Sequence, residues 1–569
     1  MLSAAREPVA KERLQAASSG WIRGWLIAFV MIGAALCLWQ YLGNAALWLN
    51  EIPVARDILD RSFWRLLTSP LNNNEVAPKG FLLAEKAAVL AFGSSGYALR
   101  LFPLLSSLIA LIVFWRVVAR RLDRLGGLVA LALFATAIPL VIFASQVKQY
   151  SSDVAVAMLL LWLALDLGDA EPSIWRGLRV GIAGAVLAWF SQPSVLVVGG
   201  LSVCLMAFLL SVPAERHHRA SPLAAALGLW IVSALASALV ALASLTHATR
   251  DYMHRFWAAG FPLRPLWGVL TTLWPRHQIG WLLGAGATAS LGCPVPALYL
   301  GLIVLGFWIL WRRNRRLAAL LLAPIGITLA AAFARQYPFS DRLILFLVPA
   351  FFAGIGVAVD HIHGWLGTWG VKGWSKPLAL LVPVLITAVA VFPMAKTPPV
   401  YRFEDIKPAL AYLQQKRLPG DSVYVYYGAA PEVAYYAHEF GLGEDSRVMG
   451  GCHRGDTRRY FEELDAFRGS PRLWVLITHA RPYGEGDDIL RYLDAIGCRQ
   501  DHLVLESRPR NSVAAPAELF LYDLSDPMRL GQANSQSATV TWGFSPSVPY
   551  GCEEGPTVMQ AHAGAAARP

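Results

Sequence analysis

The sequence predicts a polytopic α-helical membrane protein with about eleven transmembrane helices and a C-terminal α/β domain outside the membrane. Its composition is too apolar for an ordinary soluble chain, because 56% of the 569 residues are hydrophobic, only 15% are charged, and the mean hydropathy is +0.46. Runs of roughly 20 mostly apolar residues, the length that crosses a bilayer, recur up to residue 394. Beyond residue 395 the pattern changes to short strand-like runs that alternate with helical stretches.

The predicted membrane domain covers residues 24–394. Its apolar runs lie at 24–43, 97–115, 126–144, 154–168, 177–191, 193–212, 222–245, 294–311, 317–334, 342–359 and 376–394. Ser191-Gln192-Pro193 separates two of these runs, which form either a tight hairpin or one kinked element. The stretch 279–292 is too rich in Gly and Ala to be assigned to a span.

Basic residues gather in alternate loops, as expected when Lys and Arg stay on the cytoplasmic side. The basic loops contain Arg6, Lys11, Arg13, Arg23, the segment 116–124, Arg176, Arg179, Arg216, Arg219, the segment 312–316, Lys372 and Lys376. The N-terminal segment 1–23 is therefore predicted to be cytoplasmic, and the loops 44–96, 145–153, 246–293 and 335–341 extracytoplasmic, together with everything after 395. The first apolar run has span length and no small-residue cleavage pattern follows it, which favours an anchor in a bacterial inner (plasma) membrane.

Strand-like runs in the tail are typical of a small α/β domain over residues 395–528. The expected strands are 422–427, 473–477 and 519–522, and the expected helices are 406–416, 431–440 and 487–496. Residues 529–569 are rich in Ser, Ala, Gly and Pro and are predicted to be disordered.

The net charge of +11 bears on nucleic-acid binding, and the spacing of the six cysteines bears on disulfides and on cysteine-ligated metal sites. Much of the positive charge lies in the loops that the topology rule makes basic, so nucleic acid is not expected as a partner. No Cys spacing is typical of a metal site. Cys452, Cys498 and Cys552 lie in the tail, where an oxidising compartment would permit one disulfide of undetermined pairing, or three free thiols.

The first outer loop, 44–96, places a lone carboxylate, Glu51, just beyond the first span. Two amphipathic helices are predicted to follow it. The first has Ala55, Leu59, Phe63, Leu66 and Leu67 on one face, and the second covers about 80–92; the polar segment 70–78 joins them. Acids in such positions of membrane proteins are usually functional, although Glu51 could also only cap an interfacial helix.

Three groups of residues, taken in order, resemble the GT-C class of polyprenyl-phosphate-sugar glycosyltransferases, which includes protein O-mannosyltransferase-like and aminoarabinose-transferase-like enzymes. In the first outer loop they are Asn50-Glu51, Ala77-Pro78-Lys79-Gly80-Phe81-Leu82 and the stretch from Phe92 through Gly93 and Gly96 to Arg100. The class carries there an acidic motif, often Asp-Glu, then a proline-bearing segment and a Gly-containing stretch that ends in Arg. Because Asn50 replaces the first acid, Glu51 is the only carboxylate of this motif.

The resemblance continues in two later loops. The second outer loop reads Lys148-Gln149-Tyr150-Ser151-Ser152-Asp153, where the class has a basic or polar residue, a Tyr and a second acid. The segment from Arg335 through Tyr337 and Arg342 to Pro349 is similar to the Tyr/Arg segment that family members place near lipid phosphate. The resemblance thus implies Glu51 and Asp153 as catalytic residues, and as substrate-binding residues Lys148, Tyr150, Arg100, Tyr337 and Arg342.

Transfer of a sugar from a lipid phosphate to a hydroxyl needs a base for the acceptor proton and cations for the departing phosphate. Glu51 can act as the base, and Arg342, Arg100 or Lys148 can hold the phosphate by charge-assisted hydrogen bonds. The sequence identifies no certain cofactor, and a divalent metal ion bridging Glu51 and Asp153 could supply part of this charge instead. One carboxylate acting on the acceptor predicts a single displacement with inversion, as the class implies; a retaining scheme needs a nucleophile near the sugar.

Each candidate also has a purely structural interpretation. Asp153 follows Ser151 and Ser152 and could serve only as an acid in the first turn of a helix. Arg100 could extend its charge to the interface, and Arg342 could pair with surface acids or lipid headgroups. Lys148 and Tyr150 could be interface anchors.

The predicted function is transfer of a sugar from a polyprenyl-phosphate donor to an extracytoplasmic acceptor of unknown kind, in contact with membrane lipid. Two alternatives remain at this stage. A transporter or flippase of lipid-linked sugars would also have about eleven spans, but the sequence shows no inverted repeat and few charges at mid-span depth. A catalytically inactive relative that only binds lipid-linked sugar is the other, because Asn50 stands in the acidic motif.

Overall fold

A computed structural model describes residues 6–169, 173–210, 220–261, 295–368, 375–443, 447–454, 456–480, 484–508, 516–526 and 528–529. The chain divides into two compact units. The membrane unit comprises Met1–Gly43, Ile58–Leu71 and Val76–Pro399, and the α/β unit comprises Asn44–Asp57, Asn72–Glu75 and Val400–Pro569. Each unit is described by itself.

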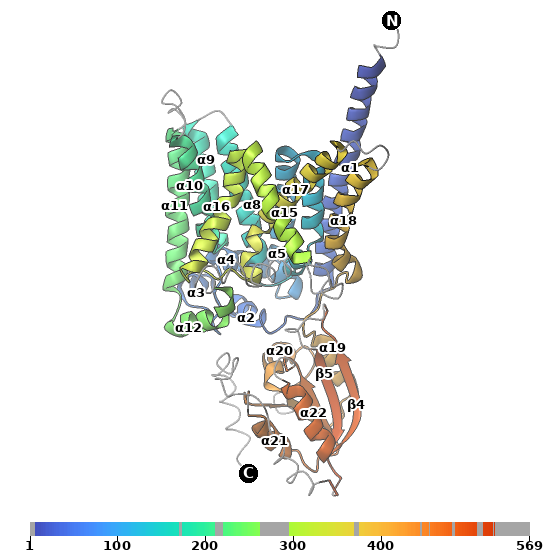
Figure 1. Ribbon diagram of the computed structural model, residues 1–569. Coiled ribbons are helices and arrows are strands. Elements are labelled where there is room, and N and C mark those ends of the chain that lie inside the picture. Colours follow the sequence, from blue (N-terminus) through green and yellow to red (C-terminus); the bar gives the residue numbers. More distant parts are fainter. Residues whose placement is uncertain are drawn as a thin grey trace. The chain divides into compact units, whose positions relative to one another are not determined.

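The membrane unit is a bundle of apolar helices (Figure 1). Along the chain they are α1 (Arg6–Leu42), α5 (Gly96–Arg121), α6 (Arg124–Thr136), α7 (Ile138–Phe143), α8 (Tyr150–Asp169), α9 (Ile174–Leu187), α10 (Ser194–Leu210), α11 (Ala220–Ala243), α15 (Val295–Arg313), α16 (Arg315–Phe333), α17 (Val348–Thr368) and α18 (Ser375–Lys396). Helices overlap each of the eleven predicted runs, but the run 126–144 is divided into α6 and α7, and the run 342–359 begins in the 3-10 helix η6 (Asp341–Leu347). Among the described residues, six helical segments are long and apolar enough to cross a membrane, so the chain is an α-helical membrane protein, and the count of eleven spans stays a prediction.

Glycines allow the central helix α17 to approach its neighbours closely. A Cβ atom on Gly356 would lie 2.2 Å from the carbonyl oxygen of Gly126 in α6, and one on Gly306 in α15 would lie 1.8 Å from that of Gly354. Small residues are what membrane helices use to bring their backbones together, since the surrounding lipid supplies no hydrophobic drive between helices. The segment Asp341–Thr368 is accordingly the most buried of the candidate spans, at 83%.

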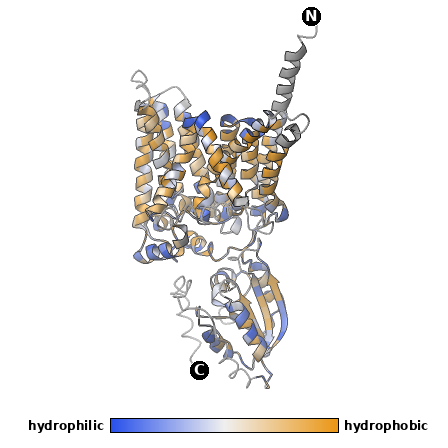
Figure 2. Cartoon of the chain, in the orientation of Figure 1, coloured by the Kyte–Doolittle hydropathy of each residue, from blue (hydrophilic) through white to orange (hydrophobic). Residues whose placement is uncertain are grey.

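The bundle has two distinct ends, and contacts between loops identify them. At the basic end, Arg313 pairs with Asp123 at 2.7 Å, Arg316 donates to the Gly168 carbonyl at 3.0 Å, and Arg176 pairs with Asp166. At the opposite end, which we call the site end, other loops meet: Gln149 donates to the Val76 carbonyl, Ser152 to the Phe190 carbonyl, and the Phe339 amide to the Gly260 carbonyl. Figure 2 shows hydrophobic residues along the bundle and hydrophilic ones gathered at its ends. Among described residues, the loops group as the alternation of basic segments predicts.

Short helices lie across the site end: α3 (Phe63–Thr68), α4 (Lys79–Phe92) and α12 (His247–Phe256), as Figure 1 shows. Two buried lysines of α4 fasten this layer, because Lys79 Nζ donates to the Leu66 carbonyl at 2.9 Å and Lys86 Nζ to the Ile58 carbonyl at 2.8 Å. Carbonyls at helix ends lack partners within the helix, and lysines often supply them. The helix predicted over 80–92 is therefore present as α4.

The first predicted amphipathic helix is wrong in one respect, because it is broken in two. Helix α2 (Ile52–Asp60) ends before Ser62, and Ser62 caps a separate helix α3 by accepting from the Arg65 amide at 3.3 Å. A Ser at this position competes with helix continuation by starting a new helix. As a result Leu66 is buried while Phe63 and Leu67, expected on the same face, are exposed.

The α/β unit is built on a five-stranded sheet with the order β2-β1-β3-β5-β4. Strands β2 (Val448–Met449), β1 (Ser422–Val425) and β3 (Leu473–Ile477) are parallel, whereas β5 (Ala517–Asp523) is antiparallel to β3 and to β4 (Cys498–Leu505). Helices α19 (Lys407–Lys416), α20 (Ala430–Tyr436), α21 (Thr457–Asp465) and α22 (Glu485–Ile496) belong to it. The three expected strands and three expected helices are present, α20 being shorter than predicted; α21, β2 and β4 were not predicted.

The sequence assigned all of 44–96 to the membrane domain, but Asn44–Asp57 and Asn72–Glu75 belong to the α/β unit. Asp57 is buried, and its carboxylate accepts from the Asn72 amide at 2.8 Å and from the Asn72 side chain at 2.7 Å. The predictions for 279–292 and for 530–569 fall outside the described residues. Cys452 is disulfide-bonded and Cys498 is a free, exposed thiol, so these two are not a pair.

Candidate active site

Asp153 lies in the first turn of α8, at the site end of the bundle. The helix starts at Tyr150, and the Asp153 amide donates to the Gln149 carbonyl at 2.9 Å. The side chain is 5% exposed, and its carboxylate accepts hydrogen bonds from the Ser191 hydroxyl and the Gln192 amide. Its Oδ1 atom is buried and has no hydrogen-bond partner among the described residues. A buried acid with one unused oxygen goes beyond what a first-turn acid requires.

The partners of Asp153 come from the break that the sequence left open at Ser191-Gln192-Pro193. Helix α9 ends at Leu187, a 3-10 turn η1 (Ala188–Phe190) follows, and α10 starts at Ser194. The Ser194 hydroxyl donates to the Ser191 carbonyl at 2.7 Å and to the Ala188 carbonyl at 3.0 Å. The break therefore has fixed geometry, and it presents polar groups to Asp153.

Arg342 lies in the 3-10 helix η6 (Asp341–Leu347), and two aromatic rings hold its guanidinium. Its Cζ atom is 5.6 Å from the ring centroid of Tyr150 and 5.2 Å from that of Trp257. Cation–π contacts of this kind orient an arginine without using its hydrogen-bond donors. The Nε–H is buried and lacks a hydrogen-bond partner in the part of the chain that the structure describes.

Tyr337 lies near Asp153 and Tyr150, and it also contacts the 3-10 helix η6 that carries Arg342. Its hydroxyl donates to the Leu343 carbonyl at 2.8 Å, which ties the loop before η6 to η6 itself. Burial raises the pKa of Tyr337 well above its usual value, and the neighbouring Asp153 and Tyr150 raise it further, so the phenol stays protonated. Four of the predicted residues are thus brought together in the membrane unit: Tyr150, Asp153, Tyr337 and Arg342.

Two more predicted residues are buried cations of the membrane unit. Lys148 stands in the turn before α8 and is 7% exposed; Arg100 is in the first part of α5 and is 3% exposed. Helix α5 contacts α8. An arginine that only reached for water at the interface would be exposed at its charged end, so burial argues against that interpretation of Arg100. A role for either cation in binding substrate stays a prediction.

Glu51 belongs to the α/β unit and is described with it. It is 1% exposed, its amide donates to the Trp48 carbonyl at 2.8 Å, and its Oε2 atom lies 3.5 Å from the Trp48 amide. Because Glu51 and Asp153 lie in different units, the metal ion predicted to bridge them stays a prediction. Within the described residues, no group of three or more His, Cys, Asp or Glu side chains is arranged to hold a metal ion.

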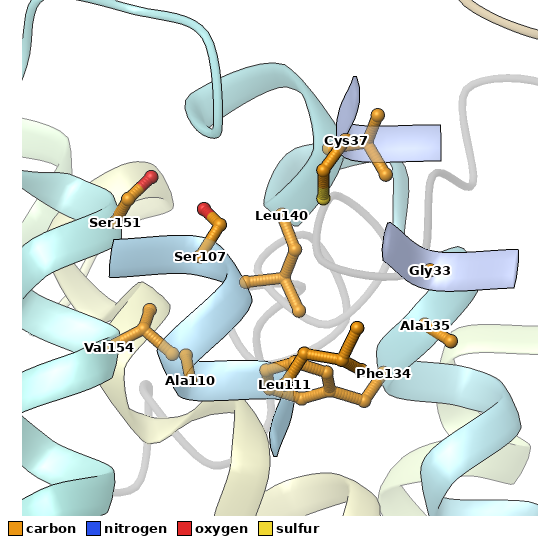
Figure 3. Close-up of a pocket in the computed structure, with 11 residues that line it drawn as sticks. Gly33, Cys37, Ser107, Ala110, Leu111, Phe134, Ala135, Leu140, Ser151 and Val154 are labelled. Carbon is orange, nitrogen blue, oxygen red and sulfur yellow. The ribbon is translucent and has the colours of Figure 1, made fainter. Parts of the chain in front are cut away.

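A cavity lies beside the start of α8, between α1, α5, α6 and α7 (Figure 3). Its walls are mostly apolar and include Cys37, Leu111, Phe134 and Val154, with the Ser107 and Ser151 side chains on one side. Residues 151 and 154 share one face of α8, whereas residue 153 is about 200° around the helix from residue 151. The cavity therefore suits an apolar group, and Asp153 faces elsewhere.

Trp257, Ser191 and Gln192 were not predicted as site residues. Trp257 sits at the C-terminal end of α12, in a long loop whose sequence carries no motif. In the sequence, Ser191 and Gln192 signal only a helix break. These residues become visible only when tertiary structure joins distant loops.

No family model matches the sequence, and no curated protein is similar to it. Among solved structures, the chain is similar to ArnT from Cupriavidus metallidurans in the apo state, with 14% identity over 89% of this chain and 98% of that chain and a TM-score of 0.43. The same protein bound to undecaprenyl phosphate gives 13% identity, 89% and 99% coverage, and a TM-score of 0.42. The Archaeoglobus fulgidus oligosaccharyltransferase complex with Zn and sulfate gives 11% identity, 88% and 73% coverage, and a TM-score of 0.45.

ArnT and the oligosaccharyltransferase are both glycosyltransferases of the GT-C class, the class that the sequence motifs of this chain resemble. The functional assignment rests on the sequence motifs and on the geometry of Asp153, Tyr150, Tyr337 and Arg342.

Proposed function

We propose that the protein is a membrane glycosyltransferase that moves a sugar from a polyprenyl-phosphate donor to an extracytoplasmic acceptor. One observation carries the proposal: a carboxylate oxygen of Asp153 and the Nε–H of Arg342 are both buried without hydrogen-bond partners, and both residues adjoin Tyr150 or Tyr337. Burying such groups costs free energy unless a ligand completes their bonding. A ligand that offers an anionic oxygen to Arg342 and a hydroxyl to Asp153 would satisfy both.

The reaction that fits is a single displacement at the anomeric carbon. The acceptor oxygen forms a bond to that carbon, the bond to the phosphate oxygen breaks, and its electron pair leaves with the polyprenyl phosphate. A carboxylate takes the acceptor proton, and attack opposite the departing phosphate inverts the anomeric centre. Arg342 offers a charge-assisted hydrogen bond to the phosphate, whose charge grows as it leaves.

Two carboxylates are candidates for the base. Glu51 is the acid of the motif that the class carries in its first outer loop, and we retain it as the predicted base. Asp153 has the oxygen that a proton donor could reach, and it is the second catalytic carboxylate of the proposal. Matched amide variants of the two separate their roles, because each removes the charge and keeps the shape.

Topology supports an extracytoplasmic site. The basic end contains the arginines of segments 116–124 and 312–316, and such segments remain in the cytoplasm. The site end is then extracytoplasmic. The disulfide at Cys452 in the α/β unit is consistent with an oxidising compartment.

The proposal is tested by transfer from a panel of radiolabelled polyprenyl-phosphate sugars, using membranes that contain the parent or Glu51→Gln at equal levels. The exposed Asp60, on the same outer loop, supplies the control Asp60→Asn. We expect transfer by the parent and the control and a loss of about 100-fold or more in Glu51→Gln. Equal transfer by Glu51→Gln would remove Glu51 from the mechanism. Binding of donor without any transfer by the parent would favour a flippase or an inactive relative.

A further inference from the structure

The segment that carries the acidic motif is held by side chains of the α/β unit. Three backbone amides of the segment end on side-chain oxygens: the Ala46 amide donates to Asp405 Oδ1 at 3.1 Å, and the Leu47 amide to the Tyr436 hydroxyl at 2.7 Å. The Leu49 amide donates to the Glu432 carboxylate. All these residues belong to the same unit. A segment without regular secondary structure has thus found partners for its backbone donors on folded elements.

Residues 46–52 are packed against the rest of the α/β unit as well as hydrogen-bonded to it. We call the residues that hold the segment, Asp405, Glu432 and Tyr436, its seat. Ala46, Leu47 and Ile52 are 3%, 1% and 1% exposed, as deep as the core of the sheet. The Trp48 ring lies 5.2 Å from that of Phe403. Buried donors that lose their acceptors are costly, so three such bonds fix the path of the chain from Ala46 to Leu49.

Unusual backbone lies beside the seat. Glu404 has φ +50° and His479 has φ +57°, conformations that residues other than glycine rarely adopt, and their side chains join at 2.9 Å. Thr478 donates to Glu432 at 3.1 Å, while the other Glu432 oxygen, buried at 0% exposure, has no hydrogen-bond partner among described residues. Strained backbone persists where the surrounding structure demands it and is concentrated at functional places.

We propose that Asp405, Glu432 and Tyr436 are positioning residues for Glu51, so that the α/β unit holds the acidic motif in place. The seat fixes Ala46 to Leu49, and the turn in which the Glu51 amide bonds to the Trp48 carbonyl at 2.8 Å then sets the direction of the Glu51 side chain. The inference rests on the proposed function for the consequence of this positioning, but the seat can be tested without it. It gives the α/β unit a role in positioning the acidic motif.

The test compares Tyr436→Phe with Tyr424→Phe in the full chain in lipid nanodiscs. Each variant removes one buried phenol oxygen, but the Tyr424 hydroxyl donates to Glu463 at 2.7 Å, whereas the Tyr436 hydroxyl accepts from the Leu47 amide. We expect the amides of residues 46–49 to exchange hydrogen about threefold to tenfold faster in Tyr436→Phe and at the parent rate in Tyr424→Phe. For transfer, Tyr436→Phe should lower kcat and leave KM for the lipid donor unchanged.

Glu432 supplies the rescue arm, because Glu432→Gln keeps an oxygen that can accept from the Leu49 amide and Glu432→Leu does not. Slow exchange in Glu432→Gln with fast exchange in Glu432→Leu supports the seat. Unchanged exchange in Tyr436→Phe and in Glu432→Leu would overturn it. Faster exchange with unchanged kcat would overturn the positioning role. If the parent transfers no sugar, the proposed function fails, and the exchange rates still decide whether the seat exists.

Discussion

The Arg313–Asp123 pair at the basic end of the membrane unit and the residues Asp153 and Arg342 at its site end differ in how their charges are satisfied. The side chains of Arg313 and Asp123 are 45% and 64% exposed and lie 2.7 Å apart. At the site end Asp153 is 5% exposed with an unpartnered oxygen, and Arg342 keeps an unpartnered Nε–H between two aromatic rings. Exposed pairs contribute roughly 0–1 kcal/mol and are easily lost, whereas buried groups without partners are costly.

The contrast separates two kinds of charged side chain. One kind follows from membrane topology, and the other is what the proposed reaction needs. Arginines at the basic end satisfy the rule that keeps cations in the cytoplasm, and any cation in any rotamer would do so. Ser191 and Gln192 hold Asp153 by hydrogen bonds, and the rings of Tyr150 and Trp257 hold Arg342. One polar atom of each residue still has no hydrogen-bond partner among the described residues. Matched substitutions at the two ends test whether only the charges at the site end matter for sugar transfer.

The largest effect is expected from Asp153→Asn, compared with Asp123→Asn at the basic end. The amide keeps the shape of Asp153 but cannot take a proton, so the rate of sugar transfer should fall about 100-fold or more. Asp123→Asn removes only an exposed ion pair and should stay within about twofold of the parent. The measurement is the initial rate of transfer in membranes with equal protein levels; a comparable loss in both variants would erase the distinction between the ends.

Arg342→Gln should have the next largest effect, on donor binding. A charge-assisted hydrogen bond contributes about 1.5–3 kcal/mol, so KM for the polyprenyl-phosphate sugar should rise roughly 10-fold to 100-fold. Arg313→Gln, which removes a cation at the basic end, is the control and should leave KM unchanged. If the lipid donor binds Arg342→Gln as tightly as it binds the parent, its phosphate lies elsewhere.

The cation–π contacts supply a smaller pair of changes. Trp257→Leu removes one of the two rings beside Arg342, and Trp308→Leu removes the ring 5.1 Å from Arg312 at the basic end. Such contacts contribute about 0.5–2 kcal/mol, so Trp257→Leu should raise KM for the donor a few-fold. Donor KM in Trp308→Leu should equal that of the parent; a rise in both would mean that either substitution disturbs the whole bundle.

The α/β unit extends the comparison to pH, with the smallest expected effect. Burial raises the pKa of Glu432 well above 4.5, and the neighbouring Glu404 and Asp405 raise it further. His479 lies beside Glu404, at 2.9 Å from its Oε1 atom. Because the folded state then binds the proton more tightly than the unfolded state, stability should fall as pH rises above about 4.5, by at most about 1.4 kcal/mol per pH unit. Glu432→Gln should remove that fall in the unfolding temperature of the full chain.

Asp421 is the paired counterpart in the same unit. Burial opposes its charge, but hydrogen bonds from Arg472, the Leu418 amide and Trp474 prevail and lower its pKa. Its contribution to stability is therefore present at neutral pH and is lost on acidification. Asp421→Asn should destabilise the unit at pH 7 and have little effect at low pH, a dependence opposite in sign to that of Glu432; the same sign for both would contradict the assignment.

Much of the bundle follows from the sequence, because apolar runs of about 20 residues and alternate basic loops are local signals. Helices overlap each of the predicted runs, and α4 begins one residue before the predicted helix 80–92. Strand β4 escaped prediction because its pattern is largely polar, as on a sheet edge, and α21 because most of its residues are charged or polar.

The motif residues of the site could be predicted from the sequence, but the residues that contact them could not. Tyr150, Asp153, Tyr337 and Arg342 stood in segments that resemble the class, and the structure brings them together. Trp257, Ser191 and Gln192 carry no local signal, since their roles arise from contacts across long sequence distances. The seat of residues 46–49 on Asp405, Glu432 and Tyr436 was likewise invisible, because it joins segments about 360 to 390 residues apart.

We expect the unpartnered Nε–H of Arg342 at the site end to bind a lipid-linked phosphate. The most direct measurement is an experimental structure of the full chain in lipid nanodiscs with polyprenyl phosphate added. We predict a phosphate oxygen at hydrogen-bond distance, about 3 Å, from Arg342 Nε. Phosphate bound among Arg312, Arg313 and Arg316 at the basic end, with the Arg342 site empty, would contradict it.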